Sequence, residues 1–237
     1  MIKTNLVYKT VLYILNKEQR GYLTPAEFNS VANQVQLEIF EKYFEDLNQQ
    51  LRSPQNDSEY ANRVKSLRDR IQIFEEYSAL VGGTLPNSFI VSSNDVHRVG
   101  TLELQIDTLP SREVQLVTRK EFSDLQRSKL TSSDQRLLYY YRIQDEFIIS
   151  NSVSSSQSEF VLYYVRKPKK VVWNYSTGSQ GQYTYTTTGS QDFELSSIEQ
   201  TEVVLKILSY AGVIIRDPQI IQNAAQMAAA EDANEKS

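Results

Sequence analysis

The side chains best suited to proton transfer, nucleophilic attack or metal binding are scarce in this sequence. Its 237 residues include one histidine, His97, and no cysteine. A single imidazole cannot form a histidine metal cluster, and the absence of cysteine excludes thiolate zinc sites, cysteine nucleophiles and disulfides. No G-x-S-x-G nucleophile elbow accompanies His97, so we expect a surface or strand-end histidine rather than part of a catalytic triad. The sequence predicts no catalytic residue and no enzyme activity.

The stretch from Asn16 to Glu27 fits the frame of a calcium-binding EF-hand loop, with Gly21 at the sixth position. Arg20, however, stands at the fifth position, where calcium needs an oxygen ligand, and its positive charge would repel the ion. The same residues suit a corner between two helices. Gly21 can end the first helix, and Thr24 with Glu27 forms a T-x-x-E capping box for the second. We therefore expect a helix–turn–helix corner and no bound metal.

The glycines of the polar loop near residues 178 to 189 also suggest no cofactor. They lack the strand-to-helix context of a dinucleotide or phosphate site, and the chain contains no GxxxxGK[ST] run.

Basic and aromatic residues are concentrated between residues 163 and 185, around the run RKPKK. Aromatic rings interleaved with basic side chains can bind single-stranded nucleic acid, but the same residue types anchor protein interfaces. The net charge of −4 favours the protein interface, because affinity for nucleic acid rests on clustered positive charge. The candidate interaction residues are Tyr163, Tyr164, Arg166, Lys167, Lys169, Lys170, Trp173, Tyr183 and Tyr185.

The elements that must position these residues begin with helices. Apolar residues at helical spacing predict a first helix from Ile2 to about Lys17 and a second that starts at Thr24 and ends near residues 53–57. A third stripe runs from Tyr60 to Phe74. The short connection predicts a long antiparallel helical hairpin over residues 24–77, although both stripes would also suit helices that face the body of the domain.

After residue 82 the pattern changes to β-branched and aromatic runs, which predict strands. The segments are FIVS, HRVGTLELQI, LLYYYRI, EFIIS and EFVLYYVRK, interrupted by a helix over residues 111–131 whose first turn is strand-like. Serine-rich residues 150–158 predict a loop, and residues 174–191 predict an exposed hairpin. A capped helix should follow residue 196 and stop at Gly212, and a last helix should start near Asp217 before a charged tail.

Together these elements predict an α+β fold, with helices flanking a mainly antiparallel sheet. The expected regions are a helical part over residues 1–81, a β-rich part over 82–195, a helix over 196–216 that packs on the core, and a docking helix or tail over 217–237, all within one structural unit. We expect no membrane span, because no apolar run approaches the length that a bilayer requires.

Four segments in this order resemble neck ring proteins of crAss-like and related short-tailed bacteriophages. They are GYLTPAEFNSVANQVQLEIFEKYFEDLNQQ, EFSDLQRSKLT, FVLYYVRKPKKVVW and FELSSIEQTEVVLKILSYAGVII. The resemblance covers most of the chain from Asn5 to Ile215 and is one of ordered pattern rather than of a single diagnostic motif.

The resemblance implies a virion structural protein that connects head to tail. Such a protein docks beneath the portal as a closed ring of about twelve copies, extends the channel through which double-stranded DNA passes, and contacts adjacent neck or tail proteins. Its location would be the virion neck, after assembly in the bacterial cytoplasm. The family has no catalytic residues to carry over, so no position here inherits a chemical role.

Overall fold

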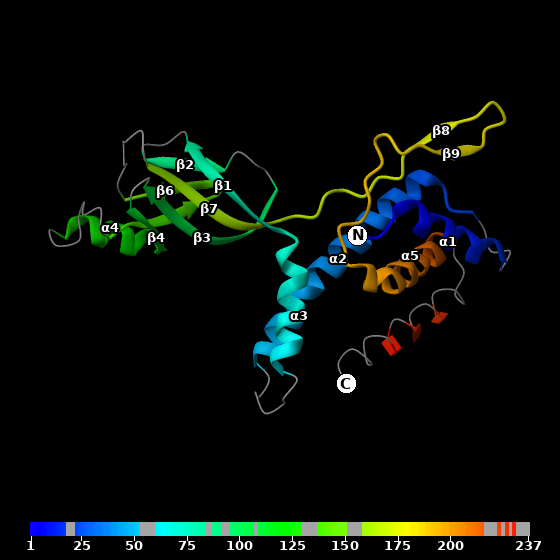
Figure 1. The fold of residues 1–237 in the computed structure, drawn as a ribbon, viewed down its shortest axis with the longest axis horizontal. Helices are drawn as coiled ribbons and strands as arrows, with labels where there is room; N and C mark the ends of the chain where they lie inside the picture. Colours follow the sequence, from blue (N-terminus) through cyan, green and yellow to red (C-terminus); the bar gives the residue numbers. More distant parts are fainter. Residues whose placement is uncertain are drawn as a thin grey trace. The chain divides into compact units, whose positions relative to one another are not determined.

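The computed structural model describes residues 1–17, 22–52, 60–83, 87–91, 95–106, 109–128, 137–150, 158–215, 222–223, 226–227 and 229–230. These residues form an α+β fold that divides into two compact units (Figure 1). The helical unit comprises residues 1–73 and 168–237, and the barrel unit comprises residues 74–167. The chain therefore leaves the helical unit once and returns to it.

The helical unit contains α1 (Thr4–Lys17), α2 (Pro25–Arg52), α3 (Tyr60–Gln72) and α5 (Gln200–Ile215), which follows the short 3-10 helix η1 (Ser197–Glu199). Helix α2 contacts both α3 and α5, and α1 also contacts α5. One face of each longer helix supplies the core, and on α2 this face includes Phe28, Val35, Ile39 and Phe40.

The predicted capping box at the start of α2 is confirmed. The Thr24 hydroxyl oxygen accepts a 3.4 Å hydrogen bond from the Glu27 backbone N–H, and Glu27 Oε2 accepts a 2.9 Å bond from the Thr24 backbone N–H. Both interactions satisfy donors that a helix start leaves unpaired. Arg20 and Gly21, which the calcium-loop frame also includes, lie outside the described residues.

The barrel unit is a closed sheet with strand order β1-β2-β6-β5-β4-β3-β7. Its strands are β1 (Glu75–Gly82), β2 (Ser88–Val91), β3 (Val96–Ile106), β4 (Leu109–Leu116), β5 (Tyr139–Ile143), β6 (Glu146–Ile149) and β7 (Ser158–Arg166). Neighbours pair antiparallel except β4 and β5, which pair in parallel. Closure leaves the sheet without a free edge.

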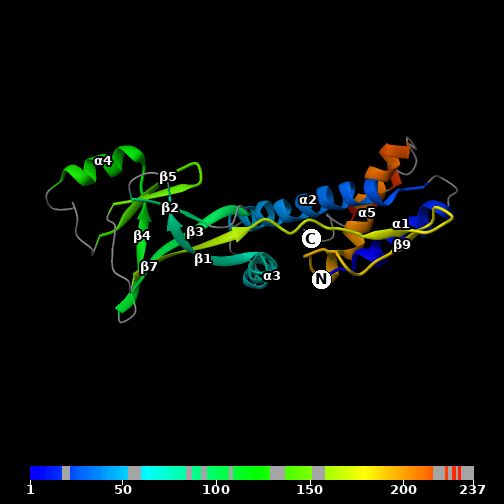
Figure 2. The same cartoon turned by 90° about the horizontal axis from the view of Figure 1, so that it is seen from above.

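Alternate residues of the strands fill the barrel, among them Leu102, Leu104, Phe147, Phe160 and Leu162. Helix α4 (Arg119–Arg127) lies alongside the strands (Figure 2) and buries Phe122 against the rings of Tyr139 and Tyr141, at centroid distances of 5.2 and 4.6 Å. This helix begins with a second capping box, from Thr118 to Glu121.

Several expectations for the middle of the chain are wrong in detail. The spacing of apolar residues predicts a third helical stripe up to Phe74 and a helical hairpin up to residue 77. In the structure, α3 ends at Gln72, and β1 begins at Glu75 and pairs with β7. The helix expected over 111–131 starts only at Arg119, because residues 109–116 form β4 between β3 and β5. In both cases strand pairing overrides weak local patterns: β1 pairs with the distant β7, and β4 pairs with its neighbour β3 and with β5. The sheet is mainly antiparallel, as expected, and its closure into a barrel is a feature that the sequence pattern did not predict.

Both ends of the C-terminal helix differ from those expected from the sequence. The Ser196 side chain makes no capping hydrogen bond, and α5 continues through Gly212 to Ile215. Glycine weakens a helix interior by only about 1 kcal/mol, which burial of the apolar face of α5 exceeds. The helix expected from Asp217 starts outside the described residues.

The boundaries of the units also differ from the expected regions. The structure divides the chain into two units, with boundaries after residues 73 and 167. The sequence pattern instead predicted a single unit, with a β-rich region between residues 82 and 195. Residues 168–195 return to the helical unit although their composition resembles that of the strands. Among the described residues, none of the helices combines the length and apolar character needed to cross a membrane.

Adjacent residues of β7 provide a test of the barrel arrangement. Leu162 is fully buried in the barrel, whereas Tyr163 is 39% exposed. We expect Leu162→Ala to lower the free energy of unfolding of the barrel unit by about 2–5 kcal/mol, because it opens a cavity. Tyr163→Ala should lower it by about 1 kcal/mol or less. Urea denaturation monitored by circular dichroism measures both, and equal losses would contradict the assigned strand faces.

Candidate interaction surface

The segment that carries the basic and aromatic residues is held against α2 by side-chain amides. Asn33 accepts a 2.8 Å hydrogen bond from the Val171 N–H and donates a 2.9 Å bond to the Val171 carbonyl oxygen. Asn29 does the same for Trp173, at 2.7 and 3.2 Å. A carboxamide carries one donor group and one acceptor, like a peptide unit, so each asparagine acts as a replacement for a neighbouring strand.

The spacing of these residues explains why a helix can replace a strand here. Asn29 and Asn33 are four residues apart on α2, a rise of roughly 6 Å. Val171 and Trp173 are two residues apart, which in extended chain spans roughly 6.6 Å. The two repeats match closely enough for both asparagines to bond at once. We call these contacts, together with those of Gln36 described next, the amide ladder.

Gln36 adds the last step of the amide ladder. Its Nε2 donates a 2.7 Å hydrogen bond to the Lys169 carbonyl oxygen, and its Oε1 accepts a 3.0 Å bond from the Glu194 N–H. Glu194 Oε2 in turn accepts a 2.8 Å bond from the Lys169 N–H. Gln36 and Glu194 are both buried. The amide ladder thus joins α2 to two separate parts of the C-terminal half of the chain.

Trp173 is fixed by the amide ladder and becomes an aromatic anchor. It is 3% exposed, and its indole Nε1 donates a 3.2 Å hydrogen bond to Asn5 Oδ1 on α1. The rings of Tyr8, Tyr175 and Tyr185 lie with centroids 4.4, 5.8 and 5.7 Å from it. The Tyr8 hydroxyl donates to the Leu23 carbonyl oxygen at 3.0 Å, and burial is the main cause that raises the pKa of Tyr8.

The exposed hairpin predicted over residues 174–191 is present and rests on this anchor. Strand β8 (Tyr175–Thr177) pairs antiparallel with β9 (Tyr183–Tyr185) as a separate two-stranded sheet. In Figure 1 the hairpin extends from the helical unit. Tyr183, 40% exposed, meets the Tyr175 ring edge-on at 4.9 Å. Tyrosine therefore lies on an extended arm whose base is the Trp173 anchor.

The remaining candidate residues divide between the two units. In the barrel unit, Tyr164 is buried among the barrel core residues, and Arg166 donates from Nε to Glu76 Oε1 at 2.7 Å while lying over the Phe74 ring. Tyr163 is exposed on the outer face beside Tyr77, at 6.0 Å between ring centroids. The side chain of Lys167 is exposed.

In the helical unit, the Lys169 and Lys170 side chains are exposed, Trp173 is buried and Tyr185 is half-buried. The structure brings together only Trp173, Tyr183 and Tyr185 from the original set. Three of the nine, Tyr164, Arg166 and Trp173, are buried rather than presented to solvent.

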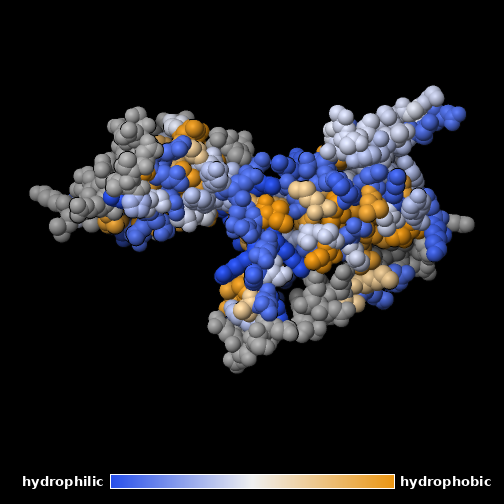
Figure 3. All heavy atoms as spheres, in the orientation of Figure 1, coloured by the Kyte–Doolittle hydropathy of each residue, from blue (hydrophilic) through white to orange (hydrophobic). Residues whose placement is uncertain are grey.

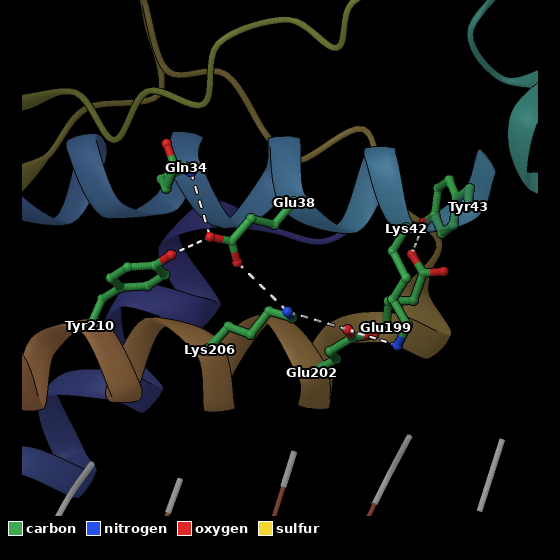
Figure 4. A network of polar contacts seen from close by, with 8 residues as sticks. All are labelled: Gln34, Glu38, Lys42, Tyr43, Glu199, Glu202, Lys206 and Tyr210. Atoms are coloured by element: carbon green, nitrogen blue, oxygen red, sulfur yellow. Dashed lines mark hydrogen bonds and ion pairs between the residues drawn. The ribbon is translucent and has the colours of Figure 1, made fainter. Parts of the chain in front are cut away.

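A polar network joins α2 to α5 on another part of the helical unit (Figure 4). Glu38 accepts hydrogen bonds from the Tyr210 hydroxyl and from Gln34, and its Oε2 lies 3.6 Å from Lys206 Nζ. Lys206 also approaches Glu202, which Lys42 contacts at 3.2 Å. Alternating charges along the two helices therefore fix their register.

At the end of this network, a buried carboxylate links α3 to η1. Glu199 accepts a hydrogen bond from the Tyr43 hydroxyl, and its Oε1 lies 3.1 Å from Arg70 Nη1. Burial is the largest cause that raises the pKa of Glu199 above its ordinary value, while the Tyr43 bond and the Arg70 charge oppose it. The contact is structural in character, since each partner is committed to the other.

The described residues contain no group of three or more histidine, cysteine or acidic side chains that could hold a metal ion. His97 lies on β3, half-buried, where its Nε2 accepts a 3.4 Å contact from Arg98 Nε. Of the two alternatives expected for His97, the position near the start of β3 fits the strand-end histidine.

Sequence inspection missed the residues that organise this surface. Asn29, Asn33 and Gln36 are polar positions inside the buried stripe of α2, and that interruption is the signal that could have revealed them. Tyr175 was also missed, although it follows Trp173 at the spacing of residues on one strand face. Comparison of the chain with models of known protein families and with curated protein sequences finds no match.

The amide ladder predicts a strong effect at Asn33. Asn33→Leu removes both bonds to Val171 and leaves its backbone groups without that partner, so we expect a loss of about 2–4 kcal/mol in the free energy of unfolding. Asn33→Asp keeps an acceptor for the Val171 N–H and should lose less. The adjacent, exposed Gln34→Leu is the control and should change stability by about 0.5 kcal/mol or less. Urea unfolding measures the series, and an Asn33→Leu variant as stable as the control would contradict the ladder.

The buried Glu199 predicts a defined pH dependence. Its raised pKa means that the folded state binds a proton more tightly than the unfolded state does. As pH falls from 7, the wild type should therefore gain stability relative to Glu199→Gln, and the gain should level off below the ordinary value of 4.5. Unfolding free energies at several pH values measure this difference. A wild type that instead loses stability relative to the variant over this range would show that the ionised form is the one favoured on folding.

Proposed function

We propose that this protein is a virion structural protein, one subunit of a closed ring in the neck of a tailed bacteriophage. The ring connects the portal to the tail and extends the DNA channel. The proposal combines the ordered resemblance to neck ring proteins with one structural observation: a tyrosine-bearing hairpin arm held at its base by a buried tryptophan.

The hairpin arm suits contact with an adjacent protein. A two-stranded sheet is marginal by itself and has two edges that another chain can extend. Here the Trp173 stack stabilises the base of the arm, while Tyr183 remains partly exposed along it. Tyrosine supplies a large contact area at low entropic cost and is enriched at interfaces. The arm therefore serves protein contact rather than chemistry.

The helices provide further contact elements in this proposal. A closed ring requires two different surfaces on each subunit, related by a rotation that closes. We propose that α2 and α3, which contact each other, form the antiparallel hairpin expected from the sequence and present one such surface. Hydrophobic side chains also lie on the face of the helical unit that Figure 3 shows. A net charge of −4 suits a channel through which DNA passes without being retained.

The alternative, binding of single-stranded nucleic acid by the residues from 163 to 173, has weaker support. A base can stack only on an exposed ring, and Trp173 and Tyr164 are buried. The Arg166 guanidinium is engaged by Glu76. Tyr163 remains exposed, but it belongs to the barrel unit, whereas Lys169 and Lys170 belong to the helical unit.

The ring proposal predicts a separable role for the C-terminal residues. Deletion of residues 217–237 should leave the unfolding midpoint unchanged while lowering assembly onto the portal at least about tenfold, because the last buried hydrophobic residue described is Ala211. Light scattering and electron microscopy of the chain, alone and with the portal protein, measure assembly. Normal rings from the truncated chain would contradict this role of the tail. A full-length chain that remains monomeric with every neck protein would contradict the ring itself.

A further inference from the structure

Helix α1 has a stripe of side chains that are exposed among the described residues. Leu6, Lys9, Tyr13 and Lys17 recur at steps of three, four and four residues, so they share one stripe of the helix. Tyr13 is 70% exposed, and Leu6 is also exposed. The helix contains no acidic residue. This stripe, which we call the α1 face, is therefore apolar and positively charged.

A groove of about 550 Å³ lies along α2, where Lys206 of α5 also lines it. Gln34, Leu37, Glu41 and Glu45 follow one another along α2 in this lining, and Leu37 is 42% exposed. Four acidic side chains and two lysines line the whole groove. The α2 groove is therefore negative in balance, with an apolar side chain in the stripe that faces out.

The two stripes have the same spacing. Gln34, Leu37, Glu41 and Glu45 are also separated by three, four and four residues, so both stripes span roughly 16 Å of helix. When the two helices run antiparallel, the order of one stripe is reversed against the other. Tyr13 then lies opposite Leu37, and Lys9 lies opposite Glu41. At these two inner positions apolar meets apolar and positive meets negative, while at the ends Leu6 lies opposite Glu45 and Lys17 lies opposite Gln34.

We propose that the α1 face of one copy of this chain docks antiparallel into the α2 groove of a second copy. The contact is heterologous, because one copy contributes α1 and the other contributes α2, as a ring requires. Its role in a neck ring rests on the proposed function, whereas the contact itself does not. Complementary charge is the reason to choose a second copy as the occupant.

The tail of the same chain is a poorer occupant of the α2 groove. Its last residues, AEDANEKS, contain three acidic side chains and one lysine. Like charges facing each other across an interface disfavour binding. The α1 face has the opposite charge and the matching spacing.

The absence of cysteine from the native chain allows a direct crosslinking test. Tyr13→Cys and Leu37→Cys are made in separate full-length chains, one carrying a tag that distinguishes it by mass, and are treated with a short bis-maleimide crosslinker. We expect a covalent heterodimer from the mixture and little product from either variant alone. Tyr163→Cys, exposed in the barrel unit, replaces Leu37→Cys as the matched control and should give little product.

Charge reversal tests the same register without any crosslinker. Lys9→Glu alone and Glu41→Lys alone should each weaken self-association about tenfold, measured by light scattering over a concentration series. A chain that carries both changes restores the opposite-charge pair and should recover most of the affinity. Circular dichroism confirms that each variant is folded. Additive losses in the double variant would overturn the proposed pairing of Lys9 with Glu41.

The outcomes separate this contact from the ring proposal. Rings seen by electron microscopy without the heterodimer crosslink overturn the contact and leave the ring standing. The crosslink and the charge rescue in open oligomers, with no ring on any portal, support the contact and overturn the ring. An intramolecular crosslink between Leu37→Cys and Met227→Cys, formed in place of the heterodimer, would assign the α2 groove to the tail and overturn the proposal.

Discussion

The helical unit depends on how the backbone of residues 169–173 is satisfied. This segment enters a buried environment without a full strand partner, and an unpaired buried peptide group costs about 1–3 kcal/mol. Carboxamides of α2 donate hydrogen bonds to the carbonyl oxygens of Lys169, Val171 and Trp173. They also accept from the N–H groups of Val171 and Trp173. Since an entire domain is stable by only about 5–15 kcal/mol, such a row of bonds decides whether the segment packs at all.

Several other features follow from this one constraint. Once Trp173 is fixed against α2 and α1, its ring provides the surface on which Tyr175 and Tyr185 pack, and the β8–β9 hairpin gains a base. Gln36 joins the same segment to Glu194. The start of the chain is joined as well, because Asp192 accepts hydrogen bonds from the Thr4 N–H and from Lys3. Segments far apart in sequence therefore meet within the helical unit.

In the barrel unit, the backbone N–H and C=O groups are paired because the sheet closes on itself. Every strand finds two neighbours, so no open edge remains, and a core of leucine and aromatic side chains fills the interior. Its outward residues are then free for other purposes, as the exposed pair Tyr77 and Tyr163 illustrates. The two units thus differ in their internal order: amide side chains organise the helical unit, and strand pairing organises the barrel unit.

Local chemistry was enough to predict many elements of this protein. The capping box at Thr24, the helical stripes, five strands and the tyrosine hairpin are all encoded within short windows, where periodicity and capping residues act directly. The sequence also determined that cysteine chemistry is absent. These features need no knowledge of distant contacts.

Only the tertiary structure decided which predicted residues are exposed and where the units divide. Strand β1 exists because the distant β7 pairs with it, and β4 because β3 and β5 pair with it. Arg166 and Trp173 are buried because Glu76, Phe74 and the amides of α2 contact them. A basic or aromatic side chain has the same local signature whether it meets solvent or a partner 90 or more residues away. That partner is chosen by packing, which no short window of sequence contains.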